Sequence, residues 1–481
     1  MRTDWYKPVM AAAGAPLRTE TFNLAIRQGG PFYMPVDPVD YIDSLLPLFT
    51  DGDLHVLQSA GLGVGAEYAY AMRGRVVVSG VPKGSWFGDR EIVLTVTGPS
   101  ALVSFLEAQV IWLQFRIQVA TLAKLHPEHL QARLGTATCR RERDIILESL
   151  DQAGVNPDFE IIVDTDGYRE HIQQRAEKLL DLVEDPERVF EAGMRAASCS
   201  EQHLIAVEAT AEAGFTRTSN IEAAIAFGMM ASGTTGHEHT QRYGSDERAF
   251  RMVRDRMVGE VTFLLDTYST RYSGLPTAIR VMNEASAHDY SIRLDSESTM
   301  EGDYLLGVHS LREANRPVPI NLGGGFDHQR TERFEALRRQ VDWPPEMQRY
   351  MYGQYLVEPH VPLPTRGAVG AVFKLSQTGT VPTMKFSDSP AKRSAPGKPV
   401  TWRLMSPGRA DRGNRPIGII GQLGEQPPAD YEILTGGRVM HTPPEMLANA
   451  IPHLSPQTQA IVDSLNASRL TLIAESTQAT L

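Results

Sequence analysis

The sequence has very few cysteines and no long hydrophobic run. Only Cys139 and Cys199 carry a thiol among its 481 residues. Two cysteines cannot form a disulfide framework, so we expect buried thiols in a reducing compartment. No apolar run reaches the roughly 18 residues that a membrane-spanning helix needs, and the first twenty residues lack the apolar core of a signal peptide. We therefore expect a cytoplasmic protein with no membrane partner.

The chain also lacks a surplus of positive charge. It contains 47 Lys and Arg against 58 Asp and Glu, which gives a formal net charge of -11. An acidic chain has no general electrostatic reason to bind nucleic acid, so we expect no such partner. The composition that is present, 42% hydrophobic and 22% charged, is ordinary for a globular protein. At roughly 150 residues per domain, this length allows two or three domains.

Four segments of different pattern follow one another along the chain. Residues 1–135 mix helical and strand-like stretches between Gly and Pro turns, which is typical of an α+β domain. Residues 136–365 alternate short apolar runs with helical stretches, which predicts βα units and a barrel. Residues 366–440 either form a small β unit or return to complete the first domain. Residues 441–481 predict terminal helices.

Acidic and glycine residues follow the apolar runs of the second segment. The runs are 159–163 before Asp164, 261–265 before Asp266, 292–294 before Asp295 and 318–322 before Gly323. In α/β folds the carboxyl ends of the strands carry the chemistry, so Asp266 and Asp295 become candidate functional residues. The alternative is that each acid only caps the helix that follows.

Two polar clusters precede the strand that ends at Asp266. Ser219 and Glu222 have the spacing of a capping box, and a helix N-terminus can also bind an anion. His237 and His239 lie in a loop with glycines and hydroxyls, where a neutral imidazole can act as a nucleophile or a proton carrier. Zinc is the weaker interpretation, because the His-Glu-x-x-His spacing is missing and the cysteines are distant. A histidine without a chemical role is the alternative.

Glycine and arginine at two later strand ends suggest anion binding. Gly323, Gly324 and Gly325 follow a strand and precede a helical stretch, which suits a backbone cradle for phosphate oxygens. Arg293 and Asp295 are two residues apart, so they share a face of the strand and can grip an anion together with a hydroxyl or cation. A structural ion pair is the alternative.

Nine short motifs in a fixed order connect these clusters to a known family. They are Thr3-Asp4-Trp5-Tyr6-Lys7-Pro8-Val9-Met10; Val81-Pro82-Lys83-Gly84-Ser85 with Gly98-Pro99; Thr218-Ser219-Asn220; Gly233-Thr234 with His237-Glu238; Asp266-Thr267-Tyr268; Arg293-Leu294-Asp295-Ser296; Phe373-Lys374-Leu375; Met384-Lys385-Phe386-Ser387; and Pro396-Gly397-Lys398. Taken in this order, they resemble the nicotinate and nicotinamide phosphoribosyltransferases over nearly the whole chain.

The resemblance implies a fold and a reaction. The fold is an irregular, TIM-like α/β barrel of the type II phosphoribosyltransferases, flanked by an α+β domain built from the N-terminal region and a C-terminal segment. In the reaction, nicotinate attacks phosphoribosyl pyrophosphate to give nicotinate mononucleotide and pyrophosphate, a step of NAD salvage. Mg²⁺ is bound to the pyrophosphate, and ATP hydrolysis is coupled through a phosphohistidine.

The resemblance also assigns roles to single residues. His237 is the phosphorylated residue, with Asp266 and Asp295 as acids around the phosphoribosyl group and no protein ligand assigned to a metal. Arg195 and Arg293 lie near the pyridine ring, and neutral Ser219 favours nicotinate because an acid there would repel a carboxylate. Gly323, Gly324, Gly325 and Gly353 bind phosphate. Tyr6 stacks on the ring from a neighbouring subunit, which implies a homodimer with shared active sites.

Several positions depart from the family pattern. Ala192 replaces a ring-stacking phenylalanine, Glu297 adds bulk and charge where the family has glycine, and Tyr355 interrupts a second glycine-rich phosphate loop. Arg217 and Lys83 also stand where the family prefers glycine and glutamate. Two alternatives therefore remain. One is a divergent phosphoribosyltransferase for another aromatic acid or base, nicotinamide included; the other is a catalytically silent, nucleotide-binding paralogue.

Overall fold

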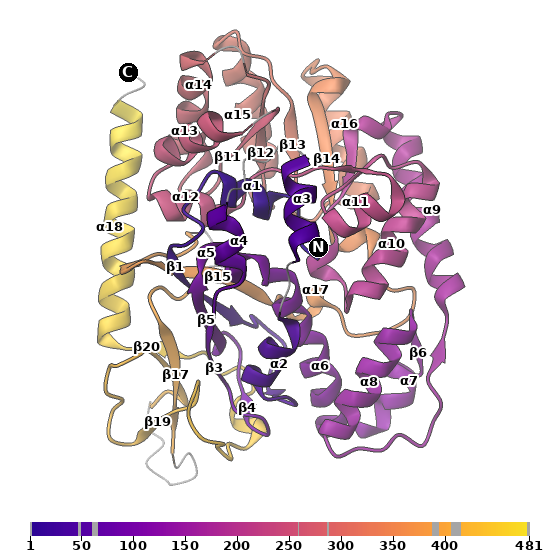
Figure 1. Cartoon of the computed structure of the whole chain (residues 1–481), viewed down its shortest axis with the longest axis vertical. Coiled ribbons are helices and arrows are strands. Elements are labelled where there is room, and N and C mark those ends of the chain that lie inside the picture. Colours follow the sequence, from indigo (N-terminus) through magenta and orange to yellow (C-terminus); the bar gives the residue numbers. More distant parts are fainter. Residues whose placement is uncertain are drawn as a thin grey trace.

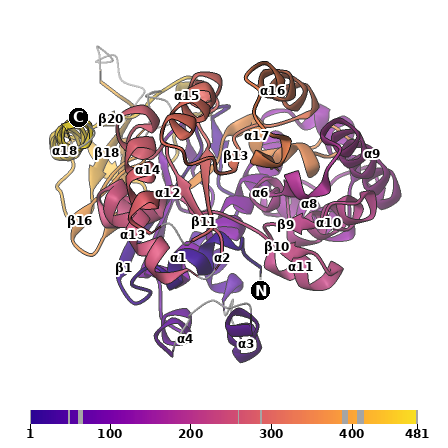
Figure 2. The same ribbon diagram turned by 90° about the horizontal axis from the view of Figure 1, so that it is seen from above.

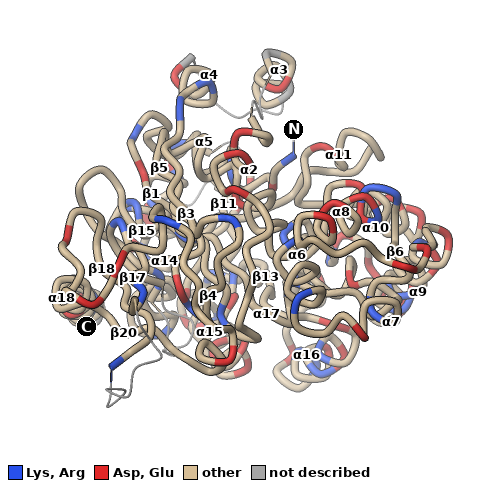
Figure 3. The backbone as a smooth tube through the Cα atoms, turned by 90° about the horizontal axis from the view of Figure 1, so that it is seen from below, with Lys and Arg blue, Asp and Glu red and all other residues tan. Residues whose placement is uncertain are grey.

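The computed structural model describes residues 2–46, 50–59, 66–257, 259–285, 288–386, 394–405 and 415–478. Ser387, which ends one of the C-terminal motifs, lies outside the described residues. A parallel sheet with its helices forms the upper half of the molecule in Figure 1, and antiparallel sheets lie below it. Acidic and basic residues are interspersed over the molecule (Figure 3). No helix in the described ranges is long and apolar enough to cross a membrane.

Seven parallel strands form the central sheet, in the order β10-β9-β8-β14-β13-β12-β11. They are β8 (Val189–Glu191), β9 (Arg217–Thr218), β10 (Met230–Ala231), β11 (Val261–Leu264), β12 (Tyr290–Leu294), β13 (Ile320–Leu322) and β14 (Gln348–Tyr352). Every residue of β11, β12 and β13 is buried, as expected for parallel strands covered on both faces. The described part of the sheet is open between β10 and β11, so it is an irregular barrel wall.

Helices surround this sheet on the outside (Figure 2). They are α9 (Thr165–Val183), α10 (Ser200–Ala213), α11 (Ile221–Phe227), α12 (His237–Tyr243), α13 (Asp246–Arg256), α14 (Leu275–Glu284), α15 (Met300–Glu313) and α16 (His328–Gln340). Their apolar faces and the strands share one core, in which Phe250 of α13 stacks on Phe263 of β11 with ring centroids 4.6 Å apart. Burying each such ring stabilises the fold by about 1.5–3 kcal/mol.

A five-stranded antiparallel sheet joins distant parts of the chain, in the order β16-β15-β1-β5-β3. Its strands are β1 (Thr19–Ala25), β3 (Val77–Gly80), β5 (Ile92–Pro99), β15 (Val372–Thr378) and β16 (Val381–Pro382). β1 pairs with β15, and Phe22 stacks on Phe373 with centroids 5.2 Å apart. Helices α2 (Pro38–Leu45), α5 (Ser100–Phe105) and α6 (Glu107–Leu125) pack on this sheet. The pairing brings the segment after residue 366 back to the N-terminal region.

The remaining elements lie around these two sheets. A four-stranded sheet contains β17 (Pro399–Leu404), β18 (Gly418–Gln422), β19 (Tyr431–Ile433) and β20 (His453–Leu454), and α18 (Pro456–Gln478) follows it. Two small sheets pair β2 (Phe32–Tyr33) with β4 (Trp86–Phe87) and β6 (Thr136–Ala137) with β7 (Ile162–Val163). The other helices are α1 (Tyr6–Ala12), α3 (Asp51–Ser59), α4 (Ala66–Met72), α7 (Leu130–Leu134), α8 (Arg140–Gln152) and α17 (Arg366–Val369).

The structure confirms the predicted fold class and corrects one strand. The run 159–163 contributes only β7, which pairs with β6 outside the seven-stranded sheet, and Ile162 is 62% exposed. This run is therefore not a barrel strand. Cys139 and Cys199 are buried thiols with their sulfur atoms 3.8 Å apart. The four-segment division at residues 135, 365 and 440 stays a prediction.

Candidate functional site

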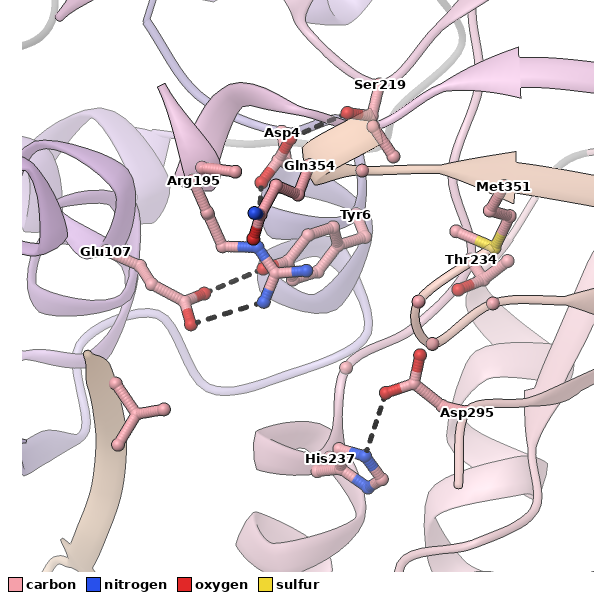
Figure 4. A pocket seen from close by; sticks show the side chains of 18 of the residues that line it. Asp4, Tyr6, Glu107, Arg195, Ser219, Thr234, His237, Asp295, Met351 and Gln354 are labelled. Carbon is pink, nitrogen blue, oxygen red and sulfur yellow. Dashed lines mark hydrogen bonds and ion pairs between the residues drawn. The ribbon is translucent and has the colours of Figure 1, made fainter. Parts of the chain in front are cut away.

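A cavity of about 490 Å³ lies where the carboxyl ends of β12, β13 and β14 face the antiparallel strand β15. Figure 4 shows the side chains that converge on it. The predicted site residues that line it are Tyr6, Arg195, Ser219, His237, Arg293, Asp295, Gly323, Gly324, Gly325 and Gly353. Asp266 lies just behind His237, with its Oδ1 atom 3.9 Å from Nε2 of that histidine. The fold therefore brings together the residues to which the family resemblance assigns a role in the site.

His237 is the first residue of α12 and has polar neighbours on both ring nitrogens. Its Nε2 lies 3.0 Å from Nζ of Lys385 and 3.6 Å from Oδ2 of Asp295, and its Nδ1 lies 3.1 Å from Oγ1 of Thr267. An ammonium group only donates, so Nε2 accepts from Lys385 and Nδ1 carries the ring proton. Burial, followed by Lys385, lowers the pKa of His237 despite the opposing carboxylates. The ring is therefore neutral near pH 7, with its Nε2 lone pair toward Nζ of Lys385, which also lines the cavity.

The neighbouring His239 has a different environment. Its Nε2 lies 3.0 Å from the carbonyl oxygen of Ala249, and burial lowers its pKa to about 3. Its ring also packs edge-on against Tyr243, with centroids 5.0 Å apart. His239 is thus held as a neutral, buried side chain, and His237 is the histidine that lines the cavity.

The two carboxylates next to His237 differ in their hydrogen-bond partners. Arg293 donates to Oδ1 of Asp295 over 2.8 Å and to the hydroxyl of Thr234 over 2.7 Å. Burial would raise the pKa of Asp295, but Arg293, followed by the neighbouring His237 and Lys385, holds it well below its usual value. Ser296 donates to Oδ2 of Asp266 over 2.6 Å, while the buried Oδ1 has no hydrogen-bond partner among the described residues.

The three glycines after β13 make a turn that only glycine fits. Gly324 and Gly325 have φ values of +80° and +77°, where side chains are strained. A Cβ atom on Gly324 would also lie 2.7 Å from the backbone oxygen of Asp295. The loop therefore passes directly against Asp295. The carboxyl group of Glu297 lies 3.3 Å from the Cβ position of Gly325, which places a negative charge beside the proposed phosphate cradle.

The structure changes the interpretation of Ser219. The residue that caps α11 is Asn220, whose side-chain oxygen accepts from the backbone N–H of Ala223 over 2.9 Å, so the capping-box interpretation of Ser219 is wrong. The hydroxyl of Ser219 instead donates to Oδ1 of Asp4 over 2.7 Å. Burial raises the pKa of Asp4 against the opposing effect of Arg195. Because Asp4 also lines the cavity, a neutral residue 219 does not leave this end of the pocket free of acid.

Tyr6 lies in the pocket of its own chain. Its hydroxyl donates to Oε2 of Glu107 over 2.7 Å, and the guanidinium of Arg195 lies 5.8 Å from its ring centroid. Tyr6 thus reaches the cavity without a second subunit, so the argument for shared sites is not supported by this structure. The homodimer itself stays a prediction.

Sequence reasoning missed several charged groups that reach the cavity from distant elements. Arg366 begins α17, Lys374 lies on β15, and Glu107 begins α6. Burial lowers the pKa of Arg366 to about 10 and that of Lys374 to about 8, and Arg195 adds to both shifts. Closely spaced buried cations favour an anionic ligand. The only signal in the sequence was that Lys374 and Lys385 belong to motifs of the family resemblance.

Two of the departures from the family pattern, Ala192 and Tyr355, line the same cavity. Gly353, Gln354 and Tyr355 follow β14, and Ala192 is bonded through its N–H to the backbone oxygen of Tyr352 over 2.7 Å. The ring of Tyr355 lies 4.6 Å below the guanidinium of Arg175. Arg217 pairs with Glu187 outside this cavity. A small side chain at 192 and a stacked tyrosine at 355 therefore change the shape of the pocket wall.

Comparisons with known proteins agree with the motifs. No family model matches the chain. Nicotinate phosphoribosyltransferase of Bacillus subtilis (strain 168) is 27% identical over 249 residues, which is 50% of this chain and 48% of that protein. The Bos taurus protein of the same name is 24% identical over 322 residues, 54% of this chain and 56% of its own length. The chain thus spans about half the length of the curated relatives it matches.

Comparison with solved structures shows a similar fold. A putative nicotinate phosphoribosyltransferase from Saccharomyces cerevisiae superposes with a TM-score of 0.57 at 15% identity, covering 82% of this chain and 93% of the other. Nicotinate phosphoribosyltransferase from Porphyromonas gingivalis gives a TM-score of 0.55 at 18% identity, with 82% and 95% covered. The chain is therefore related in sequence to the nicotinate phosphoribosyltransferases and shares their fold.

Proposed function

We propose that this chain is an enzyme that transfers the phosphoribosyl group of phosphoribosyl pyrophosphate to nicotinate, as a step of NAD salvage. The observation that carries the proposal is the neutral, buried His237 between Lys385 and the carboxylates of Asp266 and Asp295. Asp266 and Asp295 follow strands β11 and β12, and His237 begins helix α12. The names of the relatives support the same activity.

In the proposed coupling to ATP, Nε2 of His237 attacks the terminal phosphoryl group. The new N–P bond replaces the P–O bond to ADP, which leaves, and the ring proton stays on Nδ1 beside Thr267. Nε2 gives up its hydrogen bond from Lys385 when it attacks, and the ammonium group of Lys385 then attracts the negative charge of the new phosphoryl group. Later transfer of the phosphoryl group to water restores the neutral ring.

In the phosphoribosyl transfer, a new bond forms between the ring nitrogen and the sugar while the bond to pyrophosphate breaks. Negative charge then develops on the leaving pyrophosphate, and the cations Arg293, Arg366 and Lys374 can stabilise it. The glycine turn at 323–325 and Gly353 are the proposed backbone contacts for the sugar phosphate. Tyr6 and Arg195 would hold the pyridine ring at the opposite end.

Mg²⁺ fits the donor set beside His237. The cation prefers oxygen ligands, and Oδ1 of Asp266 is a buried carboxylate oxygen close to Asp295 that has no hydrogen-bond partner in the part of the chain that the structure describes. These two residues would hold the ion against substrate phosphates, where it would neutralise charge on the leaving pyrophosphate. A cytoplasmic location and a homodimer complete the proposal.

A divergent phosphoribosyltransferase is the second candidate. It is favoured by Ala192, which leaves room beside the ring end, and by Glu297, whose charge lies against Gly325. An acceptor larger than a single pyridine would use that room.

Product analysis tests the proposal. We would incubate the purified chain with phosphoribosyl pyrophosphate, ATP and Mg²⁺, together with nicotinate, nicotinamide, quinolinate or larger pyridines, and identify products by mass spectrometry. Nicotinate mononucleotide as the main product supports the proposal. A mononucleotide of another acceptor would establish the second candidate, and no product with any acceptor would contradict both.

A further inference from the structure

A second cluster of imidazole and carboxylate side chains lies at the surface, away from the cavity. His126 follows the last residue of α6, and His129 ends the short helix η1 (Pro127–His129), with Glu128 between them. All three side chains are more than half exposed. None of them lines the cavity around His237.

The donor atoms of this group face one another. Nδ1 of His126 lies 3.5 Å from Oε1 of Glu128, and Nδ1 of His129 lies 3.9 Å from the same oxygen. The two imidazole rings are stacked at 24°, with centroids 5.7 Å apart. Tetrahedral zinc with bonds of about 2.0–2.1 Å places its ligand atoms roughly 3.3 Å apart. All three donor atoms lie within 4.8 Å of one another, so they must move closer by less than about 1.5 Å to match a zinc site.

Two features of the backbone favour cation binding by these side chains. His126 directly follows the 19-residue helix α6, and the C-terminal end of a helix carries partial negative charge from its unpaired carbonyl groups. A cation bound there is stabilised by that charge. Pro127 fixes one backbone angle between the ligands, which lowers the entropy lost when they converge.

We infer that His126, Glu128 and His129 form a surface site for a borderline transition-metal cation such as Zn²⁺. Two imidazoles and one carboxylate select Zn²⁺ over Mg²⁺, which prefers oxygen ligands alone. With three protein ligands, the remaining coordination position is open to water or to a group of another molecule. The site is independent of the proposed catalytic function.

Calorimetric titration with Zn²⁺ tests this site. The tag-free full chain, freed of metal with a chelator, is titrated at mildly alkaline pH in excess Mg²⁺, which occupies oxygen-rich sites. We expect His126→Ala and His129→Ala each to bind one Zn²⁺ fewer than the unchanged chain, or to bind it at least about tenfold more weakly. The matched control is His309→Ala, because His309 is also exposed and its Nε2 lies 3.3 Å from Glu313, with no third metal-ligand side chain beside them among the described residues.

A second readout identifies the ligands directly. Co²⁺ in place of Zn²⁺ should give the visible absorption of a low-symmetry site in the unchanged chain and in His309→Ala, and lose it in the other two variants. Equal Zn²⁺ binding by all four proteins would overturn the inference. A loss in His309→Ala as large as that in His126→Ala would also overturn it, because the binding would then be non-specific.

Discussion

Glu107 contacts three cations at the end of the cavity where the pyridine ring is proposed to bind. Its side chain is only 5% exposed, and it lies 2.7 Å from Nζ of Lys7, 3.4 Å from Nζ of Lys374 and 3.6 Å from Arg195. Burial alone would raise the pKa of Glu107, but these cations hold it well below its usual value. We predict that Glu107→Gln, which keeps the shape and removes the charge, strongly destabilises the protein.

The size of the effect follows from the burial of Lys7. Without the charge of Glu107, Lys7 keeps one carboxylate partner, Glu238 at 2.9 Å, while its own side chain is 2% exposed. Removing one partner of a buried ion pair costs about 3–5 kcal/mol. An unfolding entropy of about 2.1 cal/mol/K per residue over 481 residues gives roughly 1 kcal/mol/K, so the melting temperature should fall by about 3–5 °C.

Calorimetric melting and urea unfolding of both proteins check this value. The control is Glu432→Gln, because Glu432 pairs with Arg438, whose side chain is 74% exposed. An exposed pair contributes about 0–1 kcal/mol, so this variant should melt close to the unchanged chain. If Glu107→Gln were no less stable than Glu432→Gln, the assigned role of Glu107 would be refuted.

Three further variants test the cavity. In the unchanged chain, the KM for phosphoribosyl pyrophosphate should rise above about pH 8, because Lys374 loses its proton there. Lys374→Arg should remove that rise, and a rise that persists in this variant would contradict the role of Lys374. Asp4→Asn should raise the ratio of kcat/KM for nicotinate to that for nicotinamide, because it removes an acid that repels a carboxylate; an unchanged ratio would argue against a contact between Asp4 and the ring substituent. Gly324→Ala should lower the free energy of unfolding by about 1–3 kcal/mol, because of its φ of +80°, and weaken phosphate binding; equal stability and affinity would contradict the constraint.

Three buried strands of the barrel were predictable from the sequence, whereas β14 and the shortest strands were not. The runs that became β11, β12 and β13 are mostly apolar and are followed by an acidic or glycine residue, which is typical of buried parallel strands. β9 and β10 contain two residues each, too few for any hydrophobic period to appear. The run 159–163 was misassigned because an apolar run alone does not show which partner a strand pairs with.

The residues of the candidate site also differ in whether the sequence could predict them. Asp266, Arg293 and Asp295 were found because strand ends of a parallel sheet meet at one edge. His237 was found because two histidines lie close together in a loop with glycines and hydroxyls. Lys374 could not be placed from the sequence, because it reaches the cavity through the pairing of β1 with β15, more than 300 residues apart in the chain. Likewise, the capping spacing at Ser219 could not show that its hydroxyl bonds to Asp4.

The phosphorylation of His237 is the most direct test of the account. The unchanged chain, His237→Ala and His239→Ala are mixed briefly with ATP and Mg²⁺, and their peptides are analysed by mass spectrometry under alkaline conditions that preserve phosphohistidine. We predict one acid-labile phosphoryl group on His237 in the unchanged chain, and none in His237→Ala. A phosphoryl group on His239, or ATP hydrolysis by His237→Ala in step with product formation, would contradict the account.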